Sequence, residues 1–191
     1  MIDHKHWKRA NGDGIQNQHI AIVGYSHYGE TSKDYSGFTN WAMKSYISGK
    51  GIGERFFPPV QTYFGYEGRP EFWNQVDFFN FVPECFATAK KFASADAKLK
   101  DHAQKRFLRI LTDEKPDKVF VFTRKGWNQC PPTLEEAAGG RCIPLKFNPE
   151  DNWGTYDVGG HRVKVCGFRH PLFYANSEQV AVSVREFLMM K

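Results

Sequence analysis

Several features that mark secreted, membrane and metal-binding proteins are missing from this sequence of 191 residues. Its four cysteines never occur as a C-x-x-C pair, which argues against a zinc ribbon or a redox dithiol. No apolar run is long enough to cross a bilayer, and residues 1–17 do not resemble a signal peptide. We therefore expect a soluble cytoplasmic protein with reduced thiols, without membrane contact, cofactor, metal site or metal cluster.

Aromatic residues and positive charge are what the sequence has in excess. Phe, Tyr and Trp make up 16% of the chain, the formal net charge is +5 and the sequence pI is about 9.0. Aromatic rings are ordinary core material, but exposed rings also stack on bases. A basic excess attracts polyanions, of which nucleic acid is the commonest. Composition alone leaves open both an ordinary aromatic core and a nucleic-acid partner.

After a polar start, the chain alternates apolar runs with helical segments. We expect a flexible N-terminal arm over residues 1–18 and a single domain over residues 19–191. Continuous or alternating apolar runs predict buried strands at 20–23, 77–82, 118–122 and 161–168. Helices are expected at 36–48, at about 92–110 and from about 176 onward. Residues 56–69 and 131–154 read as irregular connections, and Gly159-Gly160 predicts a hairpin turn.

This alternation of strands and helices predicts an α/β fold. We expect a three-layer α/β/α arrangement around a central, mostly parallel four-stranded sheet. In such sheets ligands bind beyond the carboxyl ends of the strands. The loops to inspect for a site therefore follow Val23, Phe81, Phe122 and Phe168.

The residues at these strand ends resemble motifs of the uracil-DNA glycosylase superfamily. The first strand is followed by GYSHYG at 24–29, the second contains FFNF at 78–81, and the last is followed by RHPLF at 169–173. The best-known branch of the family has G-Q-D-P-Y-H, a strand-ending asparagine and H-P-S-P-L in this order. The line KPDKVFVFTRKGW at 115–127 resembles the strand and turn after the long helix of the family. The resemblance implies a divergent member of the superfamily that binds DNA, and we expect a monomer.

The first two motifs imply a set of residues that binds a base extruded from DNA. Asn80 would read the edge of the base, because a side-chain amide offers both a donor and an acceptor. Phe38 would stack on the base, and Tyr28 lies where the family excludes the methyl group of thymine. Gly24 and Tyr25 complete the expected base-binding set. The alternatives are a core role for Phe38 and a bond from Asn80 to the backbone.

The last motif implies catalysis and contact with DNA. His170 resembles the histidine that donates a hydrogen bond to a base oxygen as negative charge develops on the leaving base. Leu172 or Phe173 would fill the gap left by the flipped nucleotide, and Arg169 and Pro171 would contact DNA beside them. The alternatives are a histidine that ends a strand by chance and apolar residues that cap the last helix.

Ser26 is the most important departure from the family. The family usually has Asp or Asn at this position to position or activate water, and a serine hydroxyl is a poor general base. His27, Glu30 or Asp34 from the same loop would then take over, or stabilisation of the leaving base by His170 would suffice.

Three hypotheses about function follow. The first is a DNA glycosylase that hydrolyses the N-glycosidic bond of a flipped-out base, with uracil as the expected base and Ser26, His27 and His170 as candidate catalytic residues. The second is a catalytically inactive nucleic-acid or base-binding protein on the same fold, which Ser26 favours. The third is a Ser/His hydrolase that uses Ser26 and His27. It is disfavoured because adjacent residues rarely face each other and the sequence has no G-x-S-x-G elbow.

Overall fold

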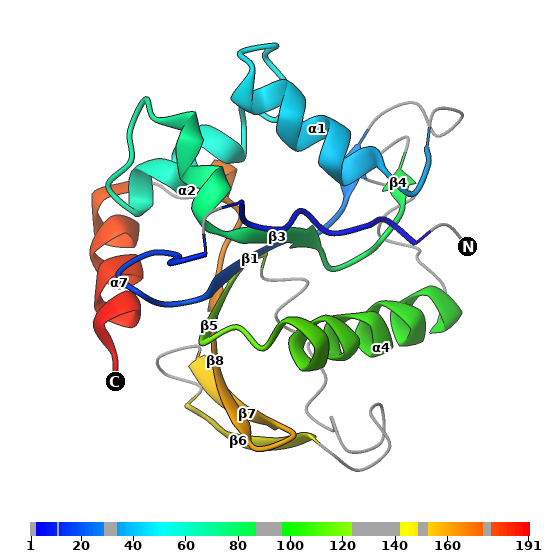
Figure 1. The fold of residues 1–191 in the computed structure, drawn as a ribbon, viewed down its shortest axis with the longest axis vertical. Coiled ribbons are helices and arrows are strands. Elements are labelled where there is room, and N and C mark those ends of the chain that lie inside the picture. The colour runs from blue at the N-terminus through cyan, green and yellow to red at the C-terminus, as the bar shows by residue number, and fades with distance from the viewer. Residues whose placement is uncertain are drawn as a thin grey trace.

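The computed structural model describes residues 3–10, 12–28, 34–86, 97–123, 142–148, 153–173 and 177–191. For Ala97, Phe173 and residues 142–148 it describes the backbone alone. The described residues form an α/β fold, in which a mostly parallel sheet has helices on both faces (Figure 1). This arrangement fits the predicted three layers.

Four parallel strands form the greater part of the sheet, in the order β3-β1-β5-β8. Their bounds are β1 Ile20–Gly24, β3 Asp77–Asn80, β5 Lys118–Phe122 and β8 His161–Phe168. All residues of β1, β3 and β5 are buried, which explains why these strands read as continuous apolar runs in the sequence.

The sheet has six strands among the described residues, so the predicted number of four is too low. Beyond β8 it continues through β7 (Trp153–Val158) and β6 (Cys142–Asn148), which are antiparallel to their neighbours. The predicted hairpin is confirmed, since Gly159 and Gly160 join β7 to β8 with φ of 64° and 84°. The sequence predicts a polar connection over 131–154, but β6 forms within it. Its Pro144 is tolerated because β6 is an edge strand.

Helices α1 (Phe38–Ile47), α2 (Phe57–Tyr63) and α7 (Ser177–Met189) lie on one side of the sheet, and α4 (Ala97–Glu114) lies on the other (Figure 1). Helix α2 forms where the sequence pattern predicts an irregular connection. Its Pro58 and Pro59 occupy the first turn, where a missing N–H costs nothing. The described residues also form short elements: the 3₁₀ turns η2 (Pro70–Gln75) and η3 (Pro171–Phe173), and the parallel pair β2 (His27–Tyr28) and β4 (Cys85–Phe86).

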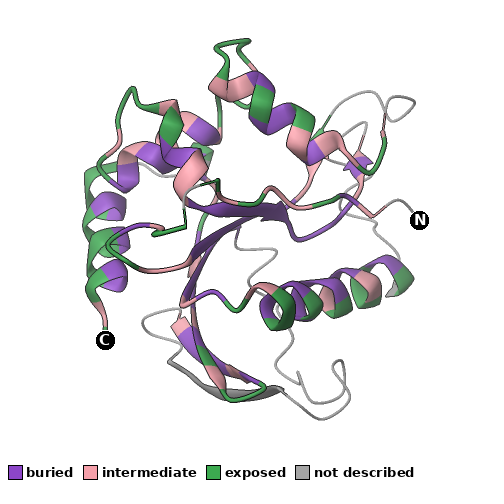
Figure 2. Cartoon of the chain, viewed as in Figure 1, coloured by how far each residue is buried: buried purple, intermediate pink, exposed green. Residues whose placement is uncertain are grey.

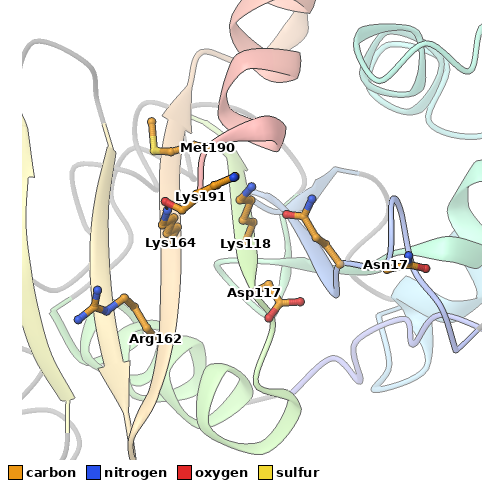
Figure 3. Close-up of a pocket in the computed structure, with 8 residues that line it drawn as sticks. Asn17, Asp117, Lys118, Arg162, Lys164, Met190 and Lys191 are labelled. Carbon is orange, nitrogen blue, oxygen red and sulfur yellow. Dashed lines mark hydrogen bonds between the residues drawn. The ribbon is translucent and has the colours of Figure 1, made fainter.

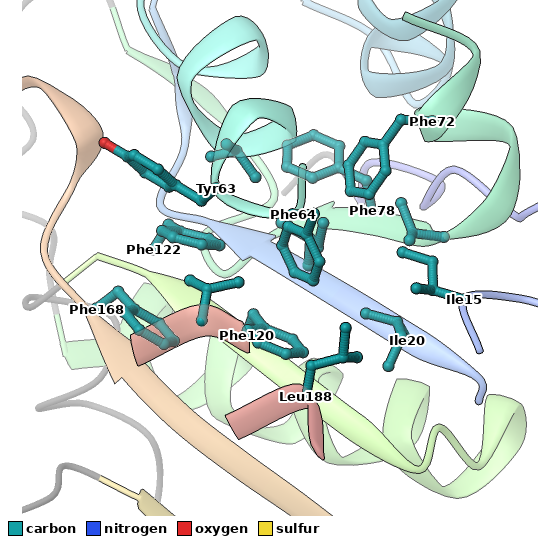
Figure 4. Packing of buried hydrophobic residues seen from close by; sticks show 14 of the residues in the cluster. Ile15, Ile20, Tyr63, Phe64, Phe72, Phe78, Phe120, Phe122, Phe168 and Leu188 are labelled. Atoms are coloured by element: carbon teal, nitrogen blue, oxygen red, sulfur yellow. The ribbon is translucent and has the colours of Figure 1, made fainter. Parts of the chain in front are cut away.

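The core has one hydrophobic cluster on each face of the sheet, and the outer faces of α1, α4 and α7 are exposed (Figure 2). On the side of α2 and α7, phenylalanines of β5 and β8 stack together (Figure 4). The ring centroids of Phe122 and Phe168 are 5.0 Å apart. On the other side, Phe79 and Phe81 pack against Phe107 of α4. Most of the aromatic excess is therefore core packing.

The described part of the predicted arm lies along the outer edge of β3. Trp7 and Phe78 exchange two backbone hydrogen bonds of 2.8 and 2.9 Å, in an antiparallel bridge. The Trp7 indole N–H donates to the carbonyl of Trp73 at 2.7 Å, and the backbone N–H of Arg9 donates to Asp77 at 2.8 Å. The polar composition of residues 1–18 gives no sign of these contacts.

None of the helices in the described ranges combines the length and the apolar character needed to cross a membrane.

Candidate functional site

Three parallel strands bring motif residues to the same end of the sheet, where their carboxyl ends lie. β1 ends at Gly24 and β3 ends at Asn80, and these two residues are register partners. β8 ends at Phe168, two residues before His170. Side chains alternate along a strand, so Asn80 lies on the same face as Phe78, the face that α2 covers. The three motifs therefore lie at the same end of the sheet, two of them on the neighbouring strands β1 and β3 and the third on β8, beyond β5.

The side-chain amide of Asn80 lies directly over Gly24. A Cβ atom on Gly24 would come within 2.3 Å of Oδ1 of Asn80, so this arrangement requires glycine at position 24. Asn80 is only 4% exposed, and its backbone carbonyl accepts a hydrogen bond from Arg106 at 2.8 Å. A side-chain amide offers both a donor and an acceptor, which makes Asn80 a candidate to bind a polar ligand.

We expect the substitution Gly24→Ala to displace the Asn80 side chain. The added methyl group has no room beside Oδ1, so overpacking should lower the free energy of unfolding by about 1–3 kcal/mol. Urea unfolding followed by circular dichroism measures this change. Gly12→Ala is the matched control, because a Cβ atom there meets nothing within 4 Å. Equal stability of the two variants would show that Asn80 does not occupy this position.

His170 is held as a neutral hydrogen-bond donor. Its Nδ1 accepts a hydrogen bond from the backbone N–H of Leu172 at 3.2 Å, so the neutral ring carries its proton on Nε2. Burial lowers the pKa of His170, which favours the neutral ring at pH 7. The ring can therefore donate from Nε2 to a ligand without bringing a positive charge.

Phe56 lies between the end of β3 and His170. The centroid of its ring is 5.7 Å from that of Phe78, 6.4 Å from that of Phe122 and 5.5 Å from that of His170. Phe56 therefore links the strand ends that carry Asn80 and His170 through one aromatic ring. In the sequence it is one of 17 phenylalanines, and no pattern distinguishes it.

His27 and Phe38 lie together in a second cluster, which includes His4 from the arm. The Phe38 ring is 4.9 Å from that of His27 and stacks on that of His4 at 5.9 Å, measured between centroids. Nε2 of His27 is hydrogen-bonded to Oγ1 of Thr39 at 3.0 Å. Burial, aided by His4 and opposed by Asp34, lowers the pKa of His27 to about 3. A ring with that pKa is too weak a base to take a proton at neutral pH.

The other groups considered as substitutes for an acidic residue at position 26 are engaged or lie outside the described residues. Oγ of Ser26 donates to the carbonyl of His27 at 3.3 Å. Asp34 accepts from Nε2 of His4 at 2.5 Å and from the backbone N–H of Cys85 at 2.9 Å. Glu30 lies outside the described residues. In the described part of this loop, each candidate base is thus neutral, weakly basic or already hydrogen-bonded.

The remaining predicted residues lie in different surroundings. Tyr25 packs on the α4 side of the sheet, where its ring stacks on Phe81 at 6.4 Å, so the structure does not bring its side chain to Asn80. Tyr28 on β2 is 54% exposed, and Leu172 is 55% exposed, as a residue that inserts into DNA would need to be. Arg169 is exposed and Pro171 is buried, while the Phe173 side chain lies outside the described residues.

A hollow of about 360 Å³ lies at the opposite end of the sheet, where β5 and β8 begin (Figure 3). Lys118 and Lys164, which are register partners, line it together with Arg162. Lys118 donates to the carbonyl of Leu188 and Lys164 to that of Lys191, and burial with nearby Lys164 lowers the pKa of Lys118 to about 8. These two lysines donate hydrogen bonds to carbonyls at the end of α7. This structural role explains why lysines line the hollow and requires no bound ligand.

Among the residues that the structure describes, no group of three or more His, Cys, Asp and Glu side chains is placed to hold a metal ion. No model of a protein family matches the sequence, and no curated protein matches it either.

Proposed function

We propose that this protein is a DNA glycosylase that binds a flipped-out uracil and hydrolyses its N-glycosidic bond. The observation that carries the proposal is the position of the largely buried Asn80, whose side-chain amide lies over Gly24 at the carboxyl ends of neighbouring parallel strands. An amide pairs with the N–H and carbonyl groups on the edge of uracil, and the glycine leaves room for it to do so. The fold would then be uracil-DNA glycosylase-like, with DNA as the partner of a monomer.

His170 has the chemistry that the reaction requires. In hydrolysis the C1′–N1 bond breaks and both of its electrons leave with the base, while water adds a hydroxyl group to C1′ and a proton to the base. A neutral His170 that donates from Nε2 stabilises the negative charge on a base oxygen as the bond breaks. Leu172, two residues further on, would fill the gap in the DNA stack, and its exposure supports this role.

A second candidate is a base-binding protein without catalytic activity on the same fold. The specific observation in its favour is the loop after β1, where Ser26 is neutral and the pKa of His27 is lowered to about 3. In that case Asn80 would hold the base and no group would activate water.

Replacing His170 separates the two candidates. We expect His170→Ala to slow excision of uracil about 10²–10³-fold, because one hydrogen-bond donor to the developing charge is lost. The measurement is single-turnover cleavage of a labelled oligonucleotide that carries one uracil, treated with hot alkali to break abasic sites. Binding of the same oligonucleotide should change little.

His161→Ala is the matched control, since His161 begins β8 and His170 follows its other end. The control should excise at the wild-type rate. Equal rates for His170→Ala and wild type would refute the role of His170. Absence of abasic product from wild type, with enzyme in excess over DNA carrying uracil, hypoxanthine or mismatched thymine, would refute hydrolysis and leave the binding protein.

A further inference from the structure

Three aromatic rings follow one another where the chain enters α1. The ring centroids of Tyr35 and Phe38 are 6.2 Å apart, and those of Phe38 and Trp41 are 5.3 Å apart. Tyr35 is 48% exposed and Trp41 is 45% exposed, with the partly buried Phe38 between them. These residues form a continuous aromatic surface, which we call the aromatic strip.

Core packing does not explain the aromatic strip. The large aromatics on both faces of the sheet are buried, including Trp73 and the phenylalanines of β3 and β5. Tyr35, just before α1, and Trp41, on α1, instead present nearly half of their surface to water. Adjacent exposed aromatic side chains usually mark a binding surface.

The charge around the aromatic strip is positive. From Tyr35 to Gly53 the chain has no acidic residue, and both of its lysines, Lys44 and Lys50, are exposed. Lys5, also exposed, is held beside the strip by a 2.7 Å hydrogen bond from its backbone N–H to the carbonyl of Ser36. The adjacent carboxylate of Asp34 is turned towards His4, and its side chain is only 5% exposed. Flat rings beside exposed lysines match a chain of bases on a phosphate backbone.

We propose that the aromatic strip binds single-stranded DNA by stacking on its bases. Every base has a flat face that an exposed ring can cover, whereas the bases of a duplex are already stacked on each other. The strip also leads to the candidate site, because Phe38 contacts His27 of the first motif at 4.9 Å. The choice of DNA rests on the proposed function. The binding itself does not require excision.

The test is fluorescence anisotropy of a labelled oligothymidylate of about 12 nucleotides, compared with a duplex of the same length. Because the oligonucleotide contains no uracil, the measurement reports on the strip and not on base excision. We expect Tyr35→Ala and Trp41→Ala each to weaken single-strand binding about tenfold and to change duplex binding little. The salt dependence should stay as in wild type, since a stacking contact releases no counterions.

Val182→Ala on α7 is the matched control, because Val182 is an exposed apolar residue, 41% accessible, on a different helix. It should bind oligothymidylate like wild type, and circular dichroism should show all three variants folded. Unchanged single-strand affinity in both strip variants would overturn the proposal, as would a wild-type protein that binds no oligothymidylate. If the variants bind oligothymidylate more weakly and the wild-type protein excises no base, the results would support DNA binding by the aromatic strip and refute the proposed glycosylase activity.

Discussion

Acidification should lower the free energy of unfolding of this protein through His27. The substitution His27→Gln should remove this decrease. The pKa of His27 is lowered to about 3 in the folded protein, from 6.5 for a free side chain. Above pH 6.5 the ring is neutral in both states and carries no penalty. As the pH falls from 6.5 towards 3, the unfolded chain binds a proton that the folded protein excludes, so the free energy of unfolding falls. Because the ring is partly exposed, we expect a total loss of about 3 kcal/mol.

Urea unfolding at a series of pH values between 7 and 4 measures this loss as a slope. Glutamine preserves a group that can bond to Thr39, so His27→Gln should differ little from wild type at pH 7 and show a shallower slope below pH 6.5. Tyr28→Phe changes the next residue of β2 without removing a group that titrates in acid, and it should keep the wild-type slope. If His27→Gln kept that slope as well, another group would be responsible for the acid sensitivity.

The substitution Arg106→Met should lower the free energy of unfolding by about 3–5 kcal/mol. Arg106 is 2% exposed, and its guanidinium donates to the carbonyl of Asn80 at 2.8 Å and to that of His4 at 2.6 Å. It also pairs with Asp3 at 2.7 Å. Burial lowers the pKa of Arg106 only to about 10, so the side chain stays charged at pH 7. Methionine fills the space but leaves the two buried carbonyls without this donor, and Asp3 keeps only Arg109 as an ion-pair partner.

Arg109→Met is the matched control, one helical turn away on α4. Arg109 pairs with the same Asp3 at 2.7 Å, but its side chain is 57% exposed, so its loss should cost less than 1 kcal/mol. Urea unfolding at pH 7 compares the two variants. Equal stabilities would mean that the bonds from Arg106 to the arm and to β3 contribute little.

The sequence predicts those parts of the fold whose residues are buried on both faces. The apolar runs that form β1, β3 and β5 are typical of strands of a parallel sheet that are covered on both faces, and all of their residues are buried. Gly159-Gly160 predicts its hairpin because only glycine adopts both of the required φ angles readily. By contrast, β6 and α2 contain prolines, and a proline is read as a breaker unless its place at an edge or in a first turn is known.

The candidate site was predictable to the extent that it lies at strand ends. Gly24, Asn80 and His170 follow or end apolar runs, so a parallel sheet brings them together at the carboxyl ends of its strands. Phe56, His4 and the other partners of the site come from segments that only the folded chain brings near. No local pattern marks an aromatic residue before α2, or a histidine in a polar arm, as part of a site.

The bridge between Trp7 and Phe78 also affects how the protein meets other copies of itself. β3 is an outer strand of the sheet, and an outer strand presents a row of backbone donors and acceptors that can pair with another chain. The arm uses part of that row, through the two hydrogen bonds between Trp7 and Phe78. The N-terminal arm, which also contributes His4 to the second cluster, thereby blocks part of the edge of β3 from pairing with a strand of another copy.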